Sequence, residues 1–222
     1  MIKAVLLDLD GTLLDTAPDI AAAANAMLAE QGLAPLPAST VRDFIGSGIA
    51  RLVERCLQVS GRPMREEALR SFGAHYRRLN GSAAAPFPGV LDALERVRAA
   101  KLRLACVTNK AAAFTLPLLE KTNLAPFFDA VVTADQVGRR KPDPAPFLQA
   151  CRALGASPGE SVVIGDSAND AEGARAAGCA VLLVSYGYSE GRDVRSIDSD
   201  GVVDSLGEAA ERLLSYRAPG PR

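Results

Sequence analysis

The sequence predicts the α/β fold class, with a Rossmann-like parallel sheet whose first strand is followed by a long helical insert. The first observation is the continuous apolar run of residues 2–7, which ends abruptly at Asp8 and is typical of a strand buried on both faces. The second is the segment 16–84, where apolar residues recur at helical spacing without a convincing strand pattern. The third is the alternation of short apolar strands with helices after residue 85, which indicates an open parallel sheet.

The first predicted helix begins shortly after the first strand. Asp15 or Thr16 can cap this helix, and Pro18 fits its first turn. Gly32 is its expected end. Two further helical stretches of the insert are marked by apolar residues at helical spacing, namely Leu52, Val53, Cys56 and Leu57, then Leu69, Phe72, Tyr76 and Leu79. The insert is therefore expected to be entirely helical.

The rest of the chain predicts helices and strands in alternation after a Pro-rich break at residues 85–89. The predicted helices begin near Val90 and cover 111–120, 145–154 and 169–177, and the predicted strands cover 102–107, 130–133, 162–165 and 180–184. We therefore expect residues 1–15 and 85–215 to form a Rossmann-like core that is interrupted by the insert at 16–84. The Pro-, Gly- and Arg-rich segment 216–222 is expected to be a flexible tail.

Composition and charge exclude several classes of function. The 222 residues are 48% hydrophobic and 23% charged, as in an ordinary globular protein, and the formal net charge is −1. This balance favours neither nucleic acid nor an anionic membrane as a partner. No apolar run approaches the length of a membrane span or a signal peptide, so we expect a cytoplasmic protein. The four scattered cysteines predict neither a zinc site nor a disulfide framework.

Reactive side chains follow the predicted strands at the points where those strands end. In chain order they are Asp8, Asp10, Thr108, Asn109, Asp166 and Asp170. Lys141 lies in a loop between two of these strands. Because ligands of open α/β sheets bind outside the carboxyl ends of the strands, we expect these side chains to surround one site.

This set of side chains suits phosphoryl transfer, which needs an in-line nucleophile, a cation near the phosphoryl oxygens and a proton for the leaving oxygen. Asp8 and Asp166 are expected to meet across adjacent strand ends, where carboxylates repel unless a cation such as Mg²⁺ lies between them. Asp8 can then attack phosphorus to give an aspartyl-phosphate, and Asp10 can protonate the leaving oxygen and later deprotonate water. Lys141 and the Thr108 hydroxyl can contact the phosphoryl oxygens.

The same residues resemble the four-motif set of the haloacid dehalogenase superfamily. The motifs are Asp8-x-Asp10-Gly11-Thr12, Thr108-Asn109, Lys141-Pro142 and Gly165-Asp166-Ser167-x-Asn169-Asp170. The resemblance implies that Asp8 is the nucleophile and Asp10 the acid and base. It also implies a Mg²⁺ site made by Asp8, Asp166 and the Asp10 backbone carbonyl, with Asp170 in support. Dehalogenases of this superfamily lack the second aspartate, so Asp10 argues for phosphate chemistry, and the insert at 16–84 resembles the superfamily's helical cap.

Finer features resemble the phosphoglycolate phosphatase branch, and they lie in segments 13–19, 44–48, 107–110, 141–144 and 186–188. The implied reaction converts 2-phosphoglycolate to glycolate and phosphate, so the expected partner is a small phosphorylated metabolite. The candidate substrate-binding residues are Thr108, Asn109, Lys141, Gly46 and Arg51. Arg51 is a candidate because it follows the glycine-rich turn at 46–48 and its guanidinium suits a carboxylate or phosphate.

Several alternatives stay open at this point. One is a phosphatase of N-acetylmuramate 6-phosphate or of another sugar phosphate. Another is a phosphomutase of the β-phosphoglucomutase type, which uses the same nucleophile and acid/base. A third is a catalytically inactive binding protein, since a fold does not dictate a function. The sequence does not decide between a monomer and a homodimer.

Overall fold

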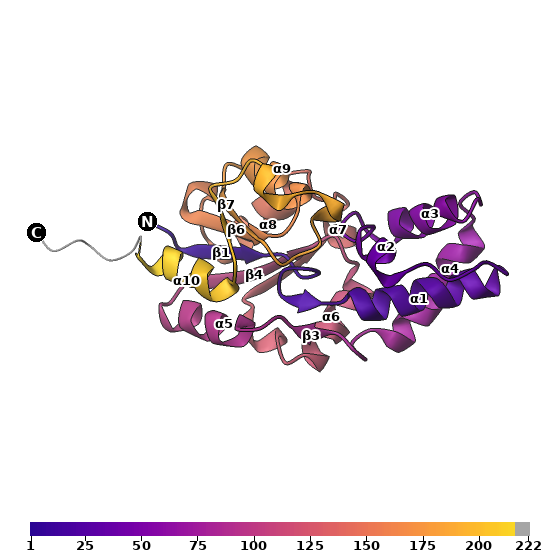
Figure 1. Cartoon of the computed structure of the whole chain (residues 1–222). Coiled ribbons are helices and arrows are strands. Elements are labelled where there is room, and N and C mark those ends of the chain that lie inside the picture. The colour runs from indigo at the N-terminus through magenta and orange to yellow at the C-terminus, as the bar shows by residue number, and fades with distance from the viewer. Residues whose placement is uncertain (216–222) are drawn as a thin grey trace, which may run out of the picture.

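The computed structural model describes residues 1–215 and has two lobes (Figure 1). The larger lobe contains a six-stranded sheet in the order β5-β4-β1-β6-β7-β8. Its strands are β1 (Ala4–Leu7), β4 (Arg103–Thr108), β5 (Ala130–Thr133), β6 (Ser161–Gly165), β7 (Ala180–Val184) and β8 (Gly201–Val203). Every neighbouring pair in this sheet is parallel, which confirms the predicted fold class. The predicted tail at 216–222 lies outside the described residues.

Helices cover both faces of this sheet, because successive residues of a strand point to opposite sides. In β1, Val5 and Leu7 join the apolar cluster on one face, and Ala4 and Leu6 join the cluster on the other. The first cluster includes α5 (Val90–Ala99), α6 (Ala112–Lys121) and α10 (Leu206–Ser215), and the second includes α8 (Ala145–Leu154) and α9 (Ala168–Ala177). The short helix α7 (Ala134–Val137) and the 3-10 turns Ala125–Phe127, Pro158–Glu160, Ser189–Gly191 and Val194–Ser196 lie in the connections.

The smaller lobe contains the four helices of the insert, and we call residues 16–84 the cap. Its helices are α1 (Ala17–Glu30), α2 (Ala38–Arg42), α3 (Ile49–Val59) and α4 (Glu66–Leu79). These helices enclose an apolar cluster of their own, in which Phe72 and Tyr76 are the largest buried side chains. Phe114 and Tyr188 of the larger lobe, the core, also join this cluster. The cap therefore packs against the core through side chains of both lobes.

A two-stranded antiparallel ribbon connects the lobes. β2 (Leu14–Asp15) carries the chain into the cap and β3 (Ala85–Pro86) carries it back. The predicted break at 85–89 therefore begins with a strand, which is too short to give an alternating pattern. Thr16 occupies the cap position of α1, but its hydroxyl donates to Asp10 Oδ1 at 2.6 Å instead of accepting a backbone N–H.

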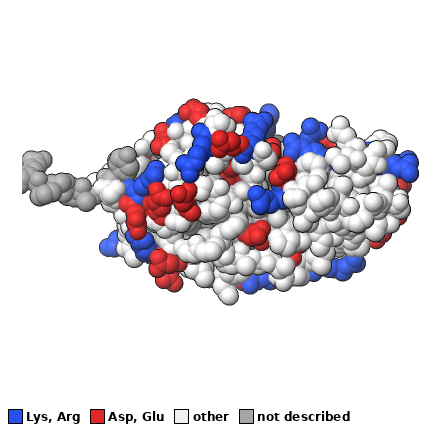
Figure 2. Space-filling view, viewed as in Figure 1, with Lys and Arg blue, Asp and Glu red and all other residues white. Residues whose placement is uncertain are grey.

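The visible surface carries charged side chains of both signs. Figure 2 shows acidic and basic side chains interspersed over the visible face of the core, and fewer charged side chains over the visible face of the cap. This mixture accords with a formal net charge of −1. All four cysteines are buried and free. Within residues 1–215, no helix combines the length and the apolar character needed to cross a membrane.

Asp19, in the first turn of α1, fixes the segment by which the chain leaves the cap. Its buried carboxylate accepts hydrogen bonds of 2.8 to 3.2 Å from four consecutive backbone N–H groups. These groups belong to Gly81, Ser82, Ala83 and Ala84. The contact ties the beginning of the cap to its end.

We expect Asp19→Ala to lower the free energy of unfolding by about 2–4 kcal/mol, because four backbone N–H groups lose a charged acceptor. Urea unfolding followed by circular dichroism measures this loss. Glu95→Ala, at an exposed position of α5, is the control and should change the free energy by less than about 0.5 kcal/mol. Equal effects of the two substitutions would show that the Asp19 carboxylate does not stabilise the protein.

Candidate active site

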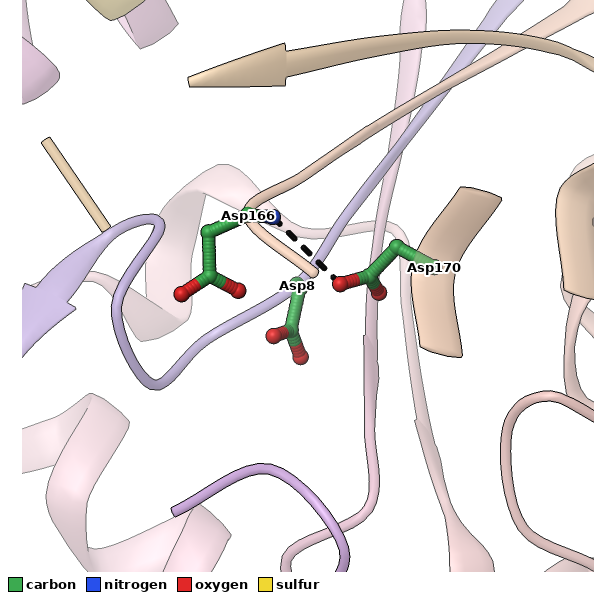
Figure 3. A group of neighbouring side chains, drawn as sticks. All are labelled: Asp8, Asp166 and Asp170. Carbon is green, nitrogen blue, oxygen red and sulfur yellow. Dashed lines mark hydrogen bonds between the residues drawn. The ribbon is translucent and has the colours of Figure 1, made fainter. Parts of the chain in front are cut away.

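Three buried aspartates meet at the carboxyl ends of β1 and β6. Asp8 directly follows β1 and Asp166 directly follows β6, and the two strands are parallel neighbours, so their ends lie side by side. Asp170 joins them from the first turn of α9. Carboxylate oxygens of the three residues lie within 4.8 Å of one another and face one common space (Figure 3). The expected meeting of Asp8 and Asp166 therefore occurs, with Asp170 as a third member.

Lys141 is buried among these carboxylates. Its Nζ donates to Asp8 Oδ1 at 2.6 Å, to Asp170 Oδ1 at 2.7 Å and to the Val107 carbonyl at 2.9 Å. All three N–H groups of the ammonium are thus used. Burial opposes the charged form of this amine, but the Asp170 and Asp8 carboxylates outweigh that effect and raise the pKa of Lys141. Lys141 is therefore a fixed positive charge beside Asp8.

One ammonium does not balance three carboxylates, and burial makes the remaining negative charge costly. Burial raises the pKa of Asp8 to about 7, a rise that Lys141 opposes and Asp170 increases. Burial, and then the Asp8 and Asp170 carboxylates, raise the pKa of Asp166 well above its ordinary value. A hard divalent cation bound by these oxygens would neutralise the excess charge. The donor set therefore fits Mg²⁺.

Hydrogen bonds hold Asp166 and Asp170 in place. Asp170 Oδ2 accepts from the backbone N–H groups of Asp166 and Ser167 at 3.3 Å each, and from the Ser167 hydroxyl at 2.8 Å. Asp166 Oδ2 accepts from the backbone N–H of Tyr188 at 2.7 Å. The other Asp166 oxygen has no hydrogen-bond partner within residues 1–215, so it is available to ligate a cation.

Three glycines leave room for these carboxylates. A Cβ on Gly11 would lie 2.2 Å from Asp166 Oδ2, and a Cβ on Gly187 would lie 2.2 Å from Asp166 Cβ. A Cβ on Gly165 would lie 2.3 Å from Asp170 Cγ. Real Cβ atoms do not approach so closely, so a larger residue at any of these positions would displace a carboxylate. Gly11 and Gly165 belong to the four motifs, whereas Gly187 lies outside them.

Asp10 lies in the turn after β1 and is held by two donors. Lys110 Nζ contacts its two oxygens at 2.7 and 2.9 Å, and the Thr16 hydroxyl donates to Oδ1 at 2.6 Å. Lys110 is buried, and although burial opposes its charge, Asp10 and then Tyr76 raise its pKa. No role for Lys110 follows from the sequence alone. Its position directly after the Thr108-Asn109 motif is the one feature that places it near the site.

Asn109 connects the site to the cap. Its Nδ2 donates to the Gly46 carbonyl at 2.9 Å and to the Lys141 carbonyl at 3.0 Å, and its Oδ1 accepts from the Lys141 N–H at 2.8 Å. Asn109 and Gly46 both line the cavity described below, but the hydrogen bonds of this amide go to the protein backbone. The Thr108 hydroxyl, also at the cavity, accepts from the Lys110 N–H at 3.1 Å. Asn109 thus positions Lys141 and the glycine-rich turn at residues 46–48, which we call the cap turn.

Glu190 makes a second contact between the cap and the core. It lies in the loop after β7 and accepts from the Ser47 hydroxyl at 2.7 Å and from Asn169 Nδ2 at 3.1 Å. Arg55 Nη2 lies 3.7 Å from its other carboxylate oxygen. Ser47 and Arg55 belong to the cap, whereas Asn169 belongs to α9 of the core. No sequence motif identifies Glu190, because its role depends on residues far away in the chain.

The cap closes over a cavity of about 40 Å³. Its lining combines Asp8 and Asp10 of the core with cap side chains, which are Ile20, Ile45, Ile49, Leu52, Phe72 and Tyr76.

The structure does not bring Arg51 to this cavity, and the expectation for this residue is corrected. Arg51 is exposed on α3 and pairs with Glu54, three residues further along the helix. Ile49 and Leu52 occupy the face of α3 that is turned to the cavity. Because residues three apart share a helix face, the residue between them points elsewhere. The other predicted site residues surround one site. They are Asp8, Asp10, Gly46, Thr108, Asn109, Lys141, Asp166 and Asp170.

Residues 5–184 match the family model described as haloacid dehalogenase-like hydrolase. The chain belongs to this family. It is 49% identical over 217 residues to a phosphoglycolate phosphatase of Nitrosospira multiformis, with 96% of each chain covered. It is 47% identical over 215 residues to a phosphoglycolate phosphatase of Thiobacillus denitrificans, with 94% of each chain covered. The crystal structure of a predicted phosphoglycolate phosphatase from Haemophilus somnus 129PT matches with a TM-score of 0.89 and 28% identity, and covers 96% of this chain and 98% of that chain.

The region that matches the family model spans the whole aspartate cluster. Residues 5–184 contain Asp8, Asp166 and Asp170, together with Asp10 and Lys141. These findings confirm the predicted resemblance to the family and to its phosphoglycolate phosphatase branch. They also confirm that the protein is an enzyme, a hydrolase of this family.

We expect Gly187→Ala to weaken Mg²⁺ binding by about 10–100-fold, because the added methyl group pushes the Asp166 carboxylate out of place. Isothermal titration of the protein with Mg²⁺ measures the affinity. Gly207→Ala is the matched control, since a Cβ there meets only the Ser205 hydroxyl, at 3.6 Å. Unchanged Mg²⁺ affinity in Gly187→Ala would contradict the role of Asp166 as a ligand.

Proposed function

We propose that the protein is a Mg²⁺-dependent phosphatase that hydrolyses small phosphate monoesters through an aspartyl-phosphate on Asp8. The observation that carries this proposal is the buried cluster of Asp8, Asp166 and Asp170 around one lysine, whose excess negative charge fits a divalent cation. Asp8 also lines the cavity, where it can reach a bound phosphoryl group. The family match supports hydrolysis as the reaction type.

Asp8 and Asp166 would hold Mg²⁺ through their carboxylate oxygens. By resemblance to the family, the backbone carbonyl of Asp10 would be a further ligand, and Asp170 would support the site by holding the loop of Asp166. When bound, the ion supplies positive charge to the phosphoryl oxygens. Lys141 adds a fixed positive charge at the same place, through its contact with Asp8.

The proposed reaction has two steps, in which Asp8 and Asp10 act together. In the first step an Asp8 oxygen bonds to phosphorus as the bond from phosphorus to the leaving oxygen breaks, and Asp10 gives its proton to that oxygen. In the second step a water oxygen attacks the same phosphorus, Asp10 takes the proton from this water, and the bond to Asp8 breaks. Inorganic phosphate leaves, Asp8 is again a carboxylate and Asp10 is again protonated.

The substrate that we propose is 2-phosphoglycolate. Relatives that carry the name phosphoglycolate phosphatase are 49% and 47% identical along almost the whole chain. These names favour 2-phosphoglycolate over N-acetylmuramate 6-phosphate and over the substrate of a β-phosphoglucomutase-type reaction. A catalytically inactive binding protein is disfavoured because the nucleophile, the acid/base and the lysine are all present.

We expect Asp8→Asn to lose essentially all turnover of 2-phosphoglycolate, because an amide does not attack phosphorus. Phosphate release is measured with Mg²⁺ and with EDTA, and the wild-type enzyme should be active only with Mg²⁺. Beryllium fluoride, an aspartyl-phosphate mimic, should bind to Asp8 in the wild-type enzyme and give no fluorine NMR signal of an adduct in the variant. Substantial turnover by Asp8→Asn, or an adduct on another residue, would contradict the proposed mechanism.

Asp10→Asn should spare the fold and most Mg²⁺ binding, since the expected metal contact of Asp10 is a backbone carbonyl. Turnover should fall by about 10²–10⁴-fold, because the leaving oxygen loses its proton donor. The loss should be smaller for p-nitrophenyl phosphate, whose leaving group needs no proton, than for an alkyl phosphate. Initial rates with both esters test this difference. Equal losses would count against proton transfer by Asp10.

A further inference from the structure

The cavity has a second polar region, formed by Lys110 and Tyr76. Both residues line the cavity wall, together with apolar cap side chains such as Ile20, Ile45 and Leu52. Lys110 Nζ lies 5.0 Å from the centre of the Tyr76 ring. Among the described residues that line the cavity, Lys110 is the only cation. Positive charge and an aromatic hydroxyl are therefore available at the part of the cavity that the apolar cap covers.

The Tyr76 hydroxyl is a donor for which residues 1–215 supply no acceptor. The side chain is 1% exposed, and its hydroxyl has no hydrogen-bond partner of normal geometry within residues 1–215. The neighbouring Lys110 ammonium can only donate to this oxygen, so the hydroxyl hydrogen has no acceptor among these residues. Buried polar groups are normally hydrogen bonded, so an unpaired hydroxyl in a cavity wall indicates a missing partner. That partner must accept a hydrogen bond beside a cation, which favours an anion.

Lys110 can pair with a second anion. A buried ammonium is costly unless an anion pairs with it, and the charged partner of Lys110 is Asp10. Lys110 Nζ contacts both oxygens of this single carboxylate, at 2.7 and 2.9 Å, and an ammonium has three N–H groups to donate. The orientation of Asp10 does not depend on Lys110 alone, since the Thr16 hydroxyl also holds it. An anion in the cavity can therefore accept from Lys110 while Asp10 stays in place.

We propose that Lys110 and Tyr76 form a carboxylate subsite, which selects phosphate monoesters that bear an acid group close to the ester oxygen. This subsite rests on the proposed function and names the residues that would recognise the substrate. With the phosphoryl group at Asp8, the rest of a small ester lies in the cavity within reach of the subsite. The carboxylate pairs with Lys110 and accepts from the Tyr76 hydroxyl. A neutral ester provides neither contact.

Kinetics with two esters test the subsite. 2-Phosphoglycolate and ethyl phosphate share the phosphate group and a two-carbon chain, but only the first carries a carboxylate. The ratio of their kcat/KM values measures selectivity, and damage to the fold or to Asp10 affects both values and leaves the ratio unchanged. A role of Lys110 that is limited to orienting Asp10 therefore predicts no change in the ratio.

Lys110→Met keeps the length of the side chain and removes its charge, and we expect it to lower the ratio by about 10–100-fold. Tyr76→Phe removes only the hydroxyl and should lower the ratio by about 3–10-fold. Lys3→Met is the matched control and should leave the ratio unchanged, since Lys3 lies at the opposite end of β1 from Asp8 and pairs with Glu160 on the surface. Circular dichroism checks that each variant is folded, and Tyr76→Phe alone decides the outcome if Lys110→Met is not.

The outcomes separate the subsite from the proposed function. A wild-type preference for 2-phosphoglycolate that Lys110→Met and Tyr76→Phe both retain would overturn the subsite and leave the proposed function intact. A wild-type enzyme that hydrolyses the two esters equally well would overturn the subsite and the proposed substrate, but not the phosphatase activity. Release of phosphate from neither ester would overturn the proposed function as well.

Discussion

Repulsion among carboxylates that are buried together is the constraint on which the rest of this structure depends. Parallel pairing of β1 with β6 brings Asp8 and Asp166 to one point, and burial makes their negative charges costly. Lys141 offsets one charge, and the hydrogen bonds of Asp170 hold the loop that carries Asp166. Nearby glycines leave space that side chains would otherwise fill. Each feature keeps negative charge in a fixed place, where a hard cation can bind.

The cap places apolar side chains beside this charged centre. Its side chains make most of the cavity wall apolar, and electrostatic interactions are stronger where water is excluded. Two polar contacts hold the cap turn against the core, one from Asn109 to Gly46 and one from Ser47 to Glu190. Asn109 also forms hydrogen bonds with the backbone of Lys141. One side chain therefore holds both a turn of the cap and the lysine at the centre of the site.

Local patterns predict much of the fold and of the site, and contacts between distant segments account for what they miss. An apolar run that stops at a polar residue marks a strand end, which is why the positions of Asp8 and Asp166 can be read from the sequence. The expectation for Arg51 is wrong because helical spacing does not say which face of a helix meets a cavity. The role of Lys110 depends on Asp10, 100 residues earlier in the chain, and no local pattern contains that contact. The ribbon of β2 and β3 is likewise a pairing of distant residues.

The ribbon also sets the mechanics of the cap. The chain enters and leaves the cap through two strands that are hydrogen bonded side by side, and Asp19 clamps the segment just before the second strand. A twist of the cap about the ribbon would break this pairing, whereas bending across the ribbon would keep the pairing and change the backbone torsion angles of the two strands. The ribbon therefore favours a single axis for any rotation of the cap against the core. A rotation that moves the cap away from the core would break the hydrogen bond from Asn109 to the Gly46 carbonyl.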